Sequence, residues 1–440
     1  MTVTKEGIFS GVKHVSPARG LVAEVVVPGD KSISHRAVIL GSIAGGVTRV
    51  EGFLDGGDNI STINAFRAMG VSIERPEAGL VIIRGAGMNG LKEPEDVIDA
   101  GNSGTTARLL AGLLSGNPFF SVITGDETLR RRPMKRVVTP LSRMGAAIRG
   151  RSGDTLLPLA ISGGALSGIT YRTPVASAQV KSAILLAGLY ADGTTTVREP
   201  EKTRDHTERM LRFFGADVEI KGNSVSVRKT RSLHGRSVTV PGDISSAAFL
   251  MVGAMITPSS ELIIKNVGIN PARSGIIPIL RKMGGTLELK NIREASGEPV
   301  ADILVKSSRL KGVDISGKEL LPAIDEFPVI CVAASCAEGK TAISGAGELR
   351  VKESDRIAVM ASMLGSVGVR NKEKKDGIVI EGAGKKALRG GLVSSHGDHR
   401  IAMSMAIAAL RSRNGIDIEG ALSVDVSFPG FFRLLEEITV

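Results

Sequence analysis

The sequence has 440 residues, and its hydrophobic fraction of 42% favours a packed globular protein of two domains. It has no apolar run of about 18 residues and no signal-peptide core in residues 1–20, so we expect no transmembrane helix and a cytoplasmic protein. The formal net charge of +11 suits small anions better than nucleic acid or a membrane surface, because aromatic residues are only 3% and no basic amphipathic helix stands out.

The first expected element is a strand at Glu24–Val27, which leads into a polar turn (Pro28-Gly29-Asp30-Lys31-Ser32-Ile33-Ser34-His35-Arg36) and then an apolar helix. The same frame recurs after residues 237–240, as Pro241-Gly242-Asp243-Ile244-Ser245-Ser246-Ala247-Ala248-Phe249. The first copy carries Lys31 and Arg36 where the second has Ile244 and Phe249. Since a helix N-terminus already favours anions, the first copy is a candidate anion site.

Four further segments share a plan of polar turn, Ala-, Leu- and Ile-rich helix, glycine turn and short strand. Their helices are expected to end near Leu114, Leu189, Ala337 and Leu410. Most are followed by a second helix that ends in an apolar residue and a glycine, as at 68–70 and 143–145. The chain therefore predicts six β-α-β-α-β units of roughly 65 to 85 residues, too large for solenoid repeats. The recurrence of Pro-Gly-Asp groups these units as three plus three.

Basic residues gather before three of the second helices, at 130–136, 202–206 and 350–356. Taken singly, such runs are more often solvated faces. Here they occupy matching positions in the repeat and mix with short polar residues suited to helix N-termini. Because the helix dipole disfavours cations at this end, several of them indicate a bound polyanion.

The sequence carries no signal for a metal, nucleotide or redox cofactor, so we expect none. It lacks a Walker loop, a Gly-x-Gly-x-x-Gly turn after a strand and a His pair at metal spacing. Cys331 and Cys336 lie in an apolar run, which favours buried, inert thiols over a disulfide or a metal site.

Five motifs, in this order and spacing, resemble the 5-enolpyruvylshikimate-3-phosphate synthase family over nearly the whole chain. They are Gly29-Asp30-Lys31-Ser32-Ile33-Ser34-His35-Arg36, Gly101-Asn102-Ser103-Gly104-Thr105, Lys202-Thr203-Arg204-Asp205-His206-Thr207-Glu208, Arg350-Val351-Lys352-Glu353-Ser354-Asp355-Arg356 and Asp398-His399-Arg400-Ile401-Ala402-Met403. The resemblance implies an α/β fold: a two-domain inside-out α/β barrel, each domain with three β-α-β-α-β-β units around a pseudo-threefold axis. We expect one domain at 25–240, a second at 1–24 and 241–440, and the active site in the interdomain cleft.

The family is a transferase of the shikimate pathway, which supplies chorismate and the aromatic amino acids. The resemblance implies transfer of the enolpyruvyl group of phosphoenolpyruvate to the 5-hydroxyl of shikimate 3-phosphate by addition and elimination, with release of phosphate. It also implies Asp325 as the base for that hydroxyl, and Glu353 and Lys31 as the groups that work at the methylene carbon. A monomer is expected.

Substrate contacts follow from the same resemblance. For shikimate 3-phosphate they are Lys31, Ser32, Arg36, Ser177, Ala178, Gln179, Arg204, Asp325 and Lys352. For phosphoenolpyruvate they are Lys31, Asn102, Gly104, Thr105, Arg132, Gln179, Arg356 and Arg400. His399, between Asp398 and Arg400, is expected to be structural.

Two positions bear on the phosphoenolpyruvate pocket. Many family members carry a Lys at the place of Val426, so one expected cation is missing. Gly104 is the position where some tolerant members carry Ala, so we expect the phosphonate inhibitor glyphosate to bind.

Two alternatives are open, and the second is from another class of protein. A sister enolpyruvyl transferase that acts on UDP-N-acetylglucosamine shares the fold, but many of its members have a Cys in the loop that is here 129–135, where this chain has none. An RNA-terminal-phosphate enzyme or RNA-binding protein would need a nucleotide site or a basic, aromatic-bearing surface, and neither is evident.

Overall fold

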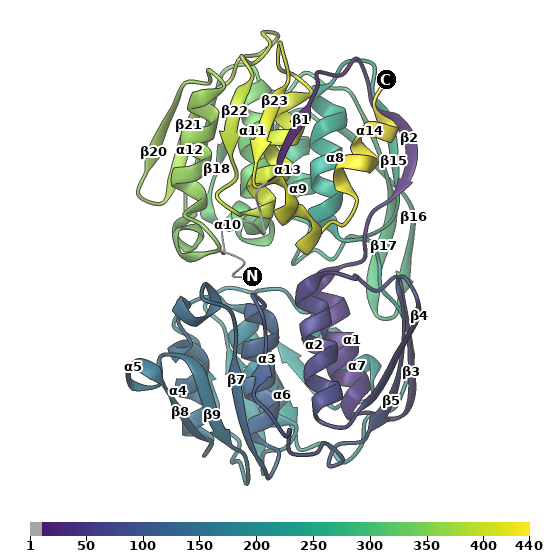
Figure 1. Ribbon diagram of the computed structural model, residues 1–440, viewed down its shortest axis with the longest axis vertical. Helices are drawn as coiled ribbons and strands as arrows, with labels where there is room; N and C mark the ends of the chain where they lie inside the picture. Colours follow the sequence, from purple (N-terminus) through teal and green to yellow (C-terminus); the bar gives the residue numbers. More distant parts are fainter. Residues whose placement is uncertain (1–10) are drawn as a thin grey trace, which may run out of the picture. The chain divides into compact units, whose positions relative to one another are not determined.

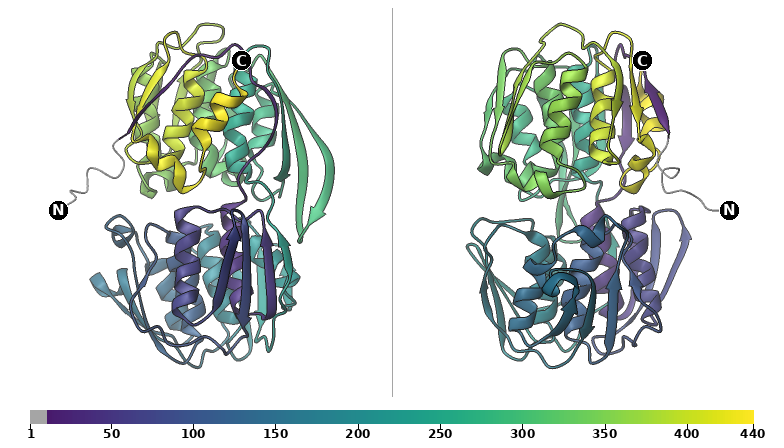
Figure 2. Two further views of the ribbon diagram at one scale, coloured as in Figure 1. Left: turned by 45° about the vertical axis from the view of Figure 1, so that its right-hand side comes forward. Right: turned by 60° about the vertical axis from the view of Figure 1, so that its left-hand side comes forward.

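The computed structural model describes residues 11–440, and its internal contacts divide them into two compact units (Figures 1 and 2). Unit 1 comprises residues 11–28, Pro241–Arg293 and Pro299–Val440, and unit 2 comprises Gly29–Val240 and Glu294–Glu298. The purple N-terminal strands accordingly lie among the yellow and green elements of unit 1 in Figure 1. Among residues 11–440, no helix has the length and apolar character needed to cross a membrane.

Unit 2 contains three four-stranded sheets of the same plan. In each, the first two strands pair in parallel and the last two complete an antiparallel hairpin. The sheet orders are β14-β3-β5-β4, β6-β7-β9-β8 and β10-β11-β13-β12. The strands are β3 (Gly45–Glu51), β4 (Ser72–Glu77), β5 (Leu80–Ala86), β6 (Ile98–Asp99), β7 (Phe120–Thr124), β8 (Ala147–Gly150), β9 (Leu156–Ser162), β10 (Thr170–Arg172), β11 (Thr194–Arg198), β12 (Val218–Lys221), β13 (Ser224–Arg228) and β14 (Ser237–Thr239).

Three helices of unit 2 are buried on almost all sides: α1 (Lys31–Ile43), α3 (Gly104–Ser115) and α6 (Ala178–Gly188). Three further helices bury one face only: α2 (Gly57–Ala68), α4 (Lys135–Arg143) and α7 (His206–Phe213). Helices that are apolar all round belong in a core, so the sheets form the outer layer. Two short helices, η2 (Leu129–Arg131) and α5 (Arg151–Asp154), lie in connections.

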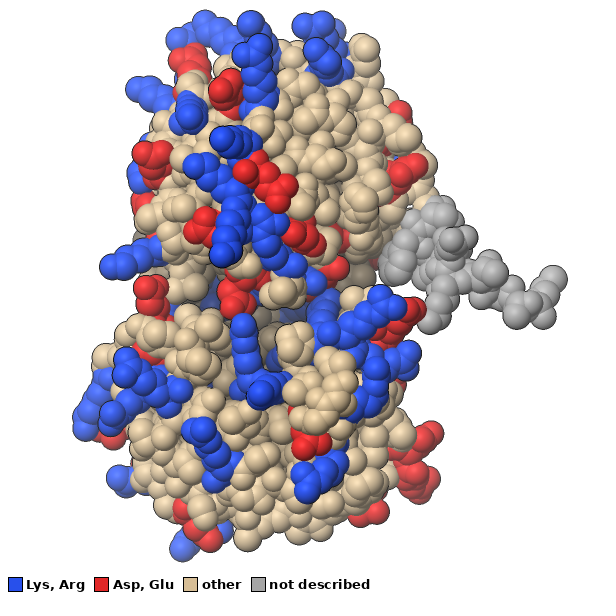
Figure 3. Space-filling view, turned by 90° about the vertical axis from the view of Figure 1, so that its left-hand side faces the viewer, with Lys and Arg blue, Asp and Glu red and all other residues tan. Residues whose placement is uncertain are grey.

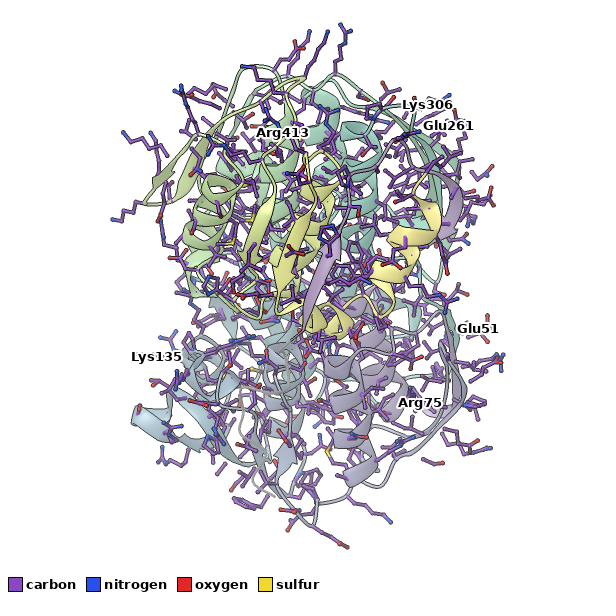
Figure 4. The ribbon with its side chains drawn as sticks, turned by 45° about the horizontal axis from the view of Figure 1, so that its top comes forward. Glu51, Arg75, Lys135, Glu261, Lys306 and Arg413 are labelled. Carbon is purple, nitrogen blue, oxygen red and sulfur yellow. The ribbon has the colours of Figure 1, made fainter. Side chains whose placement is uncertain are left out.

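Unit 1 repeats the plan with sheets β16-β17-β15-β2, β18-β19-β21-β20 and the three-stranded β1-β23-β22. Its strands are β1 (Val12–Val15), β2 (Val22–Val26), β15 (Glu261–Gly268), β16 (Thr286–Ala295), β17 (Glu298–Lys306), β18 (Asp314–Ile315), β19 (Lys340–Ile343), β20 (Asn371–Lys374), β21 (Gly377–Glu381), β22 (Gly391–Ser394) and β23 (Ile416–Glu419). Figure 4 shows the labelled Glu261 and Lys306 side by side; they are register partners on β15 and β17 with a 3.0 Å ion pair.

The buried helices of unit 1 are α8 (Ile244–Ile256), α11 (Phe327–Cys336) and α13 (His399–Ala409). Around them lie α9 (Ile276–Lys282), α10 (Gly317–Leu320), η3 (Leu321–Glu326), η4 (Gly347–Val351), α12 (Arg356–Ser366), η5 (Ala421–Val426) and α14 (Phe431–Ile438). The predicted α/β class and the six repeats are therefore confirmed.

Two strands lie outside the unit of the helix that follows them. β2 precedes α1 but pairs in parallel with β15 of unit 1, and β14 precedes α8 but pairs in parallel with β3 of unit 2. The chain passes between units directly at Pro28 and at Val240, where the Pro-Gly-Asp turn occurs. In both turns the Asp caps the helix: Asp30 accepts from Ile33 N at 2.9 Å, and Asp243 from Ser245 N at 2.8 Å.

Candidate active site

The predicted site residues of unit 2 gather at the first turns of its three central helices. Lys31, Gly104 and Ala178 are the first residues of α1, α3 and α6. Side-chain hydrogen bonds of Arg36 and Gln179 join these helices near their starts, so the three N-termini share one end of the unit. Their backbone N–H groups and dipoles favour an anion there.

Arg36 ties α1 to α6 and α7. Its Nε donates to Thr207 Oγ1 at 2.6 Å, its Nη2 to Ser182 Oγ at 2.8 Å, and its Nη1 to the Ser32 carbonyl at 2.9 Å. A guanidinium has five N–H groups, so one on each Nη atom has no protein partner within residues 11–440. Burial lowers the pKa of Arg36 to about 10, which leaves it charged at neutral pH. A buried cation with two unused donors is suited to a carboxylate or a phosphate.

Behind Arg36 lies a buried ion cluster that the sequence did not predict. Lys181 Nζ is 2.8 Å from Glu199 Oε2 and 2.6 Å from Glu208 Oε1, and these side chains are about 1% exposed. Burial raises the pKa of Glu208, against the attraction of Lys181. Lys181 stands out in the sequence only as one Lys in the apolar run of α6. The cluster holds α6 against α7, and Arg36 donates hydrogen bonds to side chains of both helices.

The candidate phosphoenolpyruvate contacts of unit 2 are held by carboxylates and amides. Lys31 forms an ion pair with Asp58 of α2, and both side chains are mostly buried. Arg132 Nη2 donates to Asn102 Oδ1 at 3.0 Å, and Asn102 Nδ2 donates to Asp126 Oδ2 at 2.7 Å. These contacts hold the two cations near the helix starts.

Gln179 joins α6 to α3 through Thr105. Its Nε2 donates to Thr105 Oγ1 at 3.0 Å, and its Oε1 accepts from Arg108 Nη1 at 2.8 Å. Arg108 thereby fixes the orientation of the amide, and it was missing from the sequence-based site. Its position four residues after Gly104 on the same helix face was the available signal. A Cβ added at Gly104 would lie 2.6 Å from Arg108 Nη1 and 3.5 Å from Arg132 Nη1.

The remaining residues predicted for unit 2 also lie at or near the starts of its helices. Ser177 is the N-cap residue of α6, and its side chain makes no capping bond. Arg204 precedes α7 and lies close enough to Arg36 to lower the pKa of Arg36 further. Ser32 and Ala178 are half-buried at the starts of α1 and α6.

In unit 1, three carboxylates lie around the Arg356 guanidinium. Its Nε lies 2.8 Å from Asp398 Oδ2, its Nη2 2.8 Å from Glu353 Oε2 and its Nη1 3.7 Å from Asp325 Oδ1. Burial alone would lower the pKa of Arg356, but Asp398 and Glu353 outweigh it and raise that pKa above its ordinary value. Asp325 is 13% exposed and Glu353 is 30% exposed, so both carboxylates remain accessible.

Asp325 directly precedes the N-cap residue of α11. It lies inside η3, and the N-cap residue of α11 is Glu326.

Arg400 is held by a second network that the sequence did not predict. Its Nη1 donates to Ser245 Oγ at 3.0 Å and to the Asp325 carbonyl at 3.1 Å. Glu326, buried beside it, takes a two-pronged contact from Arg273 Nη1 at 2.9 and 3.0 Å. Arg273 also lies 3.3 Å from Asp243. Two cations thus face two carboxylates, which balances charge in a buried place.

The basic runs that the sequence assigned to anion binding are partly paired with carboxylates of the protein itself. Arg350 is occupied by Asp355 at 2.7 Å and Glu373 at 2.9 Å, and Lys352 is exposed. Protein carboxylates therefore compensate part of the charge that the sequence assigned to a bound anion. The face in Figure 3 likewise shows acidic side chains among the basic ones on both units. Val426 ends η5 and brings no cation.

The protein has two α/β units, each with three outer sheets and with cations and carboxylates at buried helix starts. This architecture belongs to the class of enolpyruvyl-transferase folds, which solved structures share. A sequence profile of EPSP synthase (3-phosphoshikimate 1-carboxyvinyltransferase) matches residues 15–435, so the chain belongs to this family.

Relatives agree along nearly the full length. The 3-phosphoshikimate 1-carboxyvinyltransferase of Geobacter metallireducens is 60% identical over 424 residues, which cover 96% of this chain and 98% of the relative. That of Pelobacter propionicus is 59% identical over 422 residues, covering 96% and 97%. The solved EPSP synthase of Acinetobacter baumannii is 50% identical with a TM-score of 0.89, covering 97% and 98%. The enolpyruvyl transferase NikO of Streptomyces tendae shares the fold, at 18% identity, 97% coverage of both chains and a TM-score of 0.77.

Proposed function

We propose that the protein transfers the enolpyruvyl group of phosphoenolpyruvate to the 5-hydroxyl of shikimate 3-phosphate and releases phosphate. The observation that carries this proposal is the family membership over residues 15–435, with relatives of the same activity up to 60% identical. The hydrogen-bonded cations at the helix starts support it, because both substrates carry a phosphate and a carboxylate. The activity belongs to the shikimate pathway, which leads to chorismate and the aromatic amino acids.

Unit 2 provides most of the proposed contacts to shikimate 3-phosphate. Arg36, with one unused N–H on each Nη atom, would bind the ring carboxylate. Ser177 and Arg204 would bind the phosphate, aided by the N-terminus of α6. Ser32, Ala178, Gln179 and Lys31 complete this set, with Asp325 and Lys352 from unit 1.

Phosphoenolpyruvate would be bound by cations of both units. Lys31 and Arg132, steadied by Asp58 and Asn102, serve from unit 2, with Gly104, Thr105 and Gln179 beside them. Arg356 and Arg400 serve from unit 1. The proposal therefore needs both units in one reaction, as the resemblance to the family implies for an interdomain active site.

The chemistry requires three proton transfers. In the addition step Asp325 takes the proton of the 5-hydroxyl, the hydroxyl oxygen bonds to C2 of phosphoenolpyruvate, and C3 gains a proton from Glu353 or Lys31. In the elimination step C3 loses a proton, the double bond returns, and the phosphate leaves C2. Positioned acids and bases of this kind contribute on the order of 10²- to 10⁴-fold in rate.

Two finer points belong to the proposal. Glyphosate, a phosphonate, would compete with phosphoenolpyruvate, because Gly104 has no methyl to narrow the site. The protein would be a monomer, since the large exposed apolar residues, such as Val12, Phe120 and Ile292, are scattered over different elements.

The experiment is a phosphate-release assay with phosphoenolpyruvate and one acceptor at a time. Phosphate release with shikimate 3-phosphate and none with UDP-N-acetylglucosamine is the expected result. Release with UDP-N-acetylglucosamine alone would replace the proposal by the sister activity.

A further inference from the structure

His35 is a buried side chain to which the proposed reaction gives no role. It lies in α1 one helical turn after Lys31 and has no exposed surface. Its Nδ1 is 2.7 Å from Thr62 Oγ1 on α2, while its Nε2 has no partner within residues 11–440. A buried polar ring with one satisfied nitrogen needs an explanation.

The contact to Thr62 is the first link of a hydroxyl chain. Thr62 Oγ1 is 2.7 Å from Thr106 Oγ1, and Thr106 Oγ1 is 2.7 Å from Ser103 Oγ. Ser103 is the N-cap residue of α3 and accepts from Thr106 N at 3.1 Å. The chain therefore runs from α1 through α2 to the start of α3, where Gly104 begins the helix.

The lack of a partner at His35 Nε2 fixes the direction of donation along this hydrogen-bond chain. If Nδ1 carries the proton, it donates to Thr62, Thr62 donates to Thr106, and Thr106 donates to Ser103 or to the Asp58 carbonyl 3.3 Å away, so that these three protons all have acceptors. If Nε2 carries the proton instead, a buried N–H has no acceptor, which is the more costly defect. The geometry favours the Nδ1–H form of a neutral ring.

The ring is neutral over the working pH range. Burial lowers the pKa of His35 to about 3; Asp58 opposes this shift, and Lys31 and Arg36 add to it. The hydrogen-bond chain from His35 is thus fixed in one protonation state.

We propose that His35 is a positioning residue: its Nδ1–H, through Thr62 and Thr106, fixes the start of α1 with Lys31 against the start of α3 with Gly104. The inference rests on the proposed function, in which these two helix starts bind phosphoenolpyruvate. Arg36 is anchored separately, to Ser182 and Thr207. The binding of shikimate 3-phosphate should therefore depend much less on the hydrogen-bond chain from His35.

The kinetic test uses Thr62→Val, which keeps the shape of the side chain and removes the hydroxyl, beside Thr62→Ser, which restores it. Loss of one buried hydrogen bond predicts a rise of about tenfold in KM for phosphoenolpyruvate for Thr62→Val, a much smaller change for shikimate 3-phosphate, and rescue by Thr62→Ser. His35→Asn, which can place an amide N–H near the Nδ1 position, should resemble wild type, and His35→Leu should resemble Thr62→Val. The control is Ser42→Ala. Ser42 is a buried residue of α1 that takes no part in the hydrogen-bond chain, and its hydroxyl has no partner within residues 11–440. Equal rises in both KM values, or no rise, would overturn the proposal.

A second measurement does not depend on activity. Nitrogen-15 NMR of histidine-labelled wild type, with His35→Asn to assign the signal, should show a neutral Nδ1–H ring that does not titrate between about pH 5 and pH 8. An Nε2–H ring, or titration in this range, would overturn the proposal even if the enzyme is active. A wild type that releases no phosphate while His35 shows the Nδ1–H form would contradict the proposed function and leave the hydrogen-bond chain standing.

Discussion

The Asp325 carboxylate lies 3.7 Å from Arg356 Nη1 and is 13% exposed, which places an accessible base beside a fixed cation. We predict that Asp325→Ala lowers kcat by about a hundredfold or more, the scale for a positioned acid or base. Phosphate release at saturating substrates measures it, with circular dichroism to confirm folding. Asp217→Ala, which removes an exposed carboxylate of unit 2, should keep wild-type activity. Wild-type turnover in Asp325→Ala would exclude the base role.

Gly104 begins α3 beside two guanidinium groups, so a methyl there must displace Arg108 Nη1, 2.6 Å away, and narrow the space near Arg132. Overpacking of about 1 to 3 kcal/mol predicts that Gly104→Ala raises the inhibition constant of glyphosate roughly tenfold to a hundredfold, and KM for phosphoenolpyruvate by less.

Inhibition curves decide the glyphosate prediction, with Gly57→Ala as the matched control. Gly57 begins α2 in the same way, and a Cβ there would meet nothing within 4 Å. A wild type indifferent to glyphosate, or equal inhibition of Gly104→Ala and wild type, would refute the steric argument.

At the scale of elements, the network of Arg273, Glu326 and Arg400 joins α8, η3 and α13. Glu326→Gln removes one charge from a balanced buried group, so we predict a loss of about 3 kcal/mol in the free energy of unfolding. KM for phosphoenolpyruvate should rise as well, since Arg400 loses a neighbouring carboxylate 3.7 Å away.

Urea unfolding compares this variant with Glu261→Gln. Glu261 pairs with Lys306 on the surface, where such a pair contributes about 0 to 1 kcal/mol. Equal, small losses for the two variants would show that the Arg273–Glu326 contact contributes no more than a surface pair.

The burial of His35 in α1 predicts how acid affects stability. Its folded pKa of about 3 lies below the ordinary 6.5, so between these values the unfolded chain binds the proton and the folded chain does not. The free energy of unfolding should therefore fall with decreasing pH, by up to about 1.4 kcal/mol per pH unit from this residue. His35→Asn should show a shallower fall than wild type between about pH 6 and pH 4 in urea titrations. Identical slopes would contradict the neutral buried ring.

Local features of these elements could be predicted from the sequence. The caps of α1 and α8 by Asp30 and Asp243 follow from one recurring tripeptide, since capping involves neighbours in the chain. The Arg273–Glu326 contact could not be predicted from composition or periodicity, because its partners are 53 residues apart. The pairing partners of β2 and β14 could not be predicted from local sequence patterns either, since strand pairing depends on distant residues. Resemblance to the family supplied most site residues, yet it omitted Arg108.

At the scale of the whole molecule, the net charge of +11 acts on both anionic substrates. Salt screens such attraction over about 10 Å at 0.1 M and about 3 Å at 1 M. We predict that KM for phosphoenolpyruvate rises several-fold between about 0.05 and 0.5 M sodium chloride, while kcat changes less. Initial rates at both ionic strengths measure it. A KM that does not respond to salt would show that short-range contacts alone attract the substrate.

The most direct measurement is mass spectrometry of the organic product, combined with phosphate release, after wild-type enzyme acts on phosphoenolpyruvate and shikimate 3-phosphate. We expect one enolpyruvyl ether of shikimate 3-phosphate for each phosphate released. Phosphate release without that product, or no reaction with this acceptor while UDP-N-acetylglucosamine is converted, would contradict the proposed function.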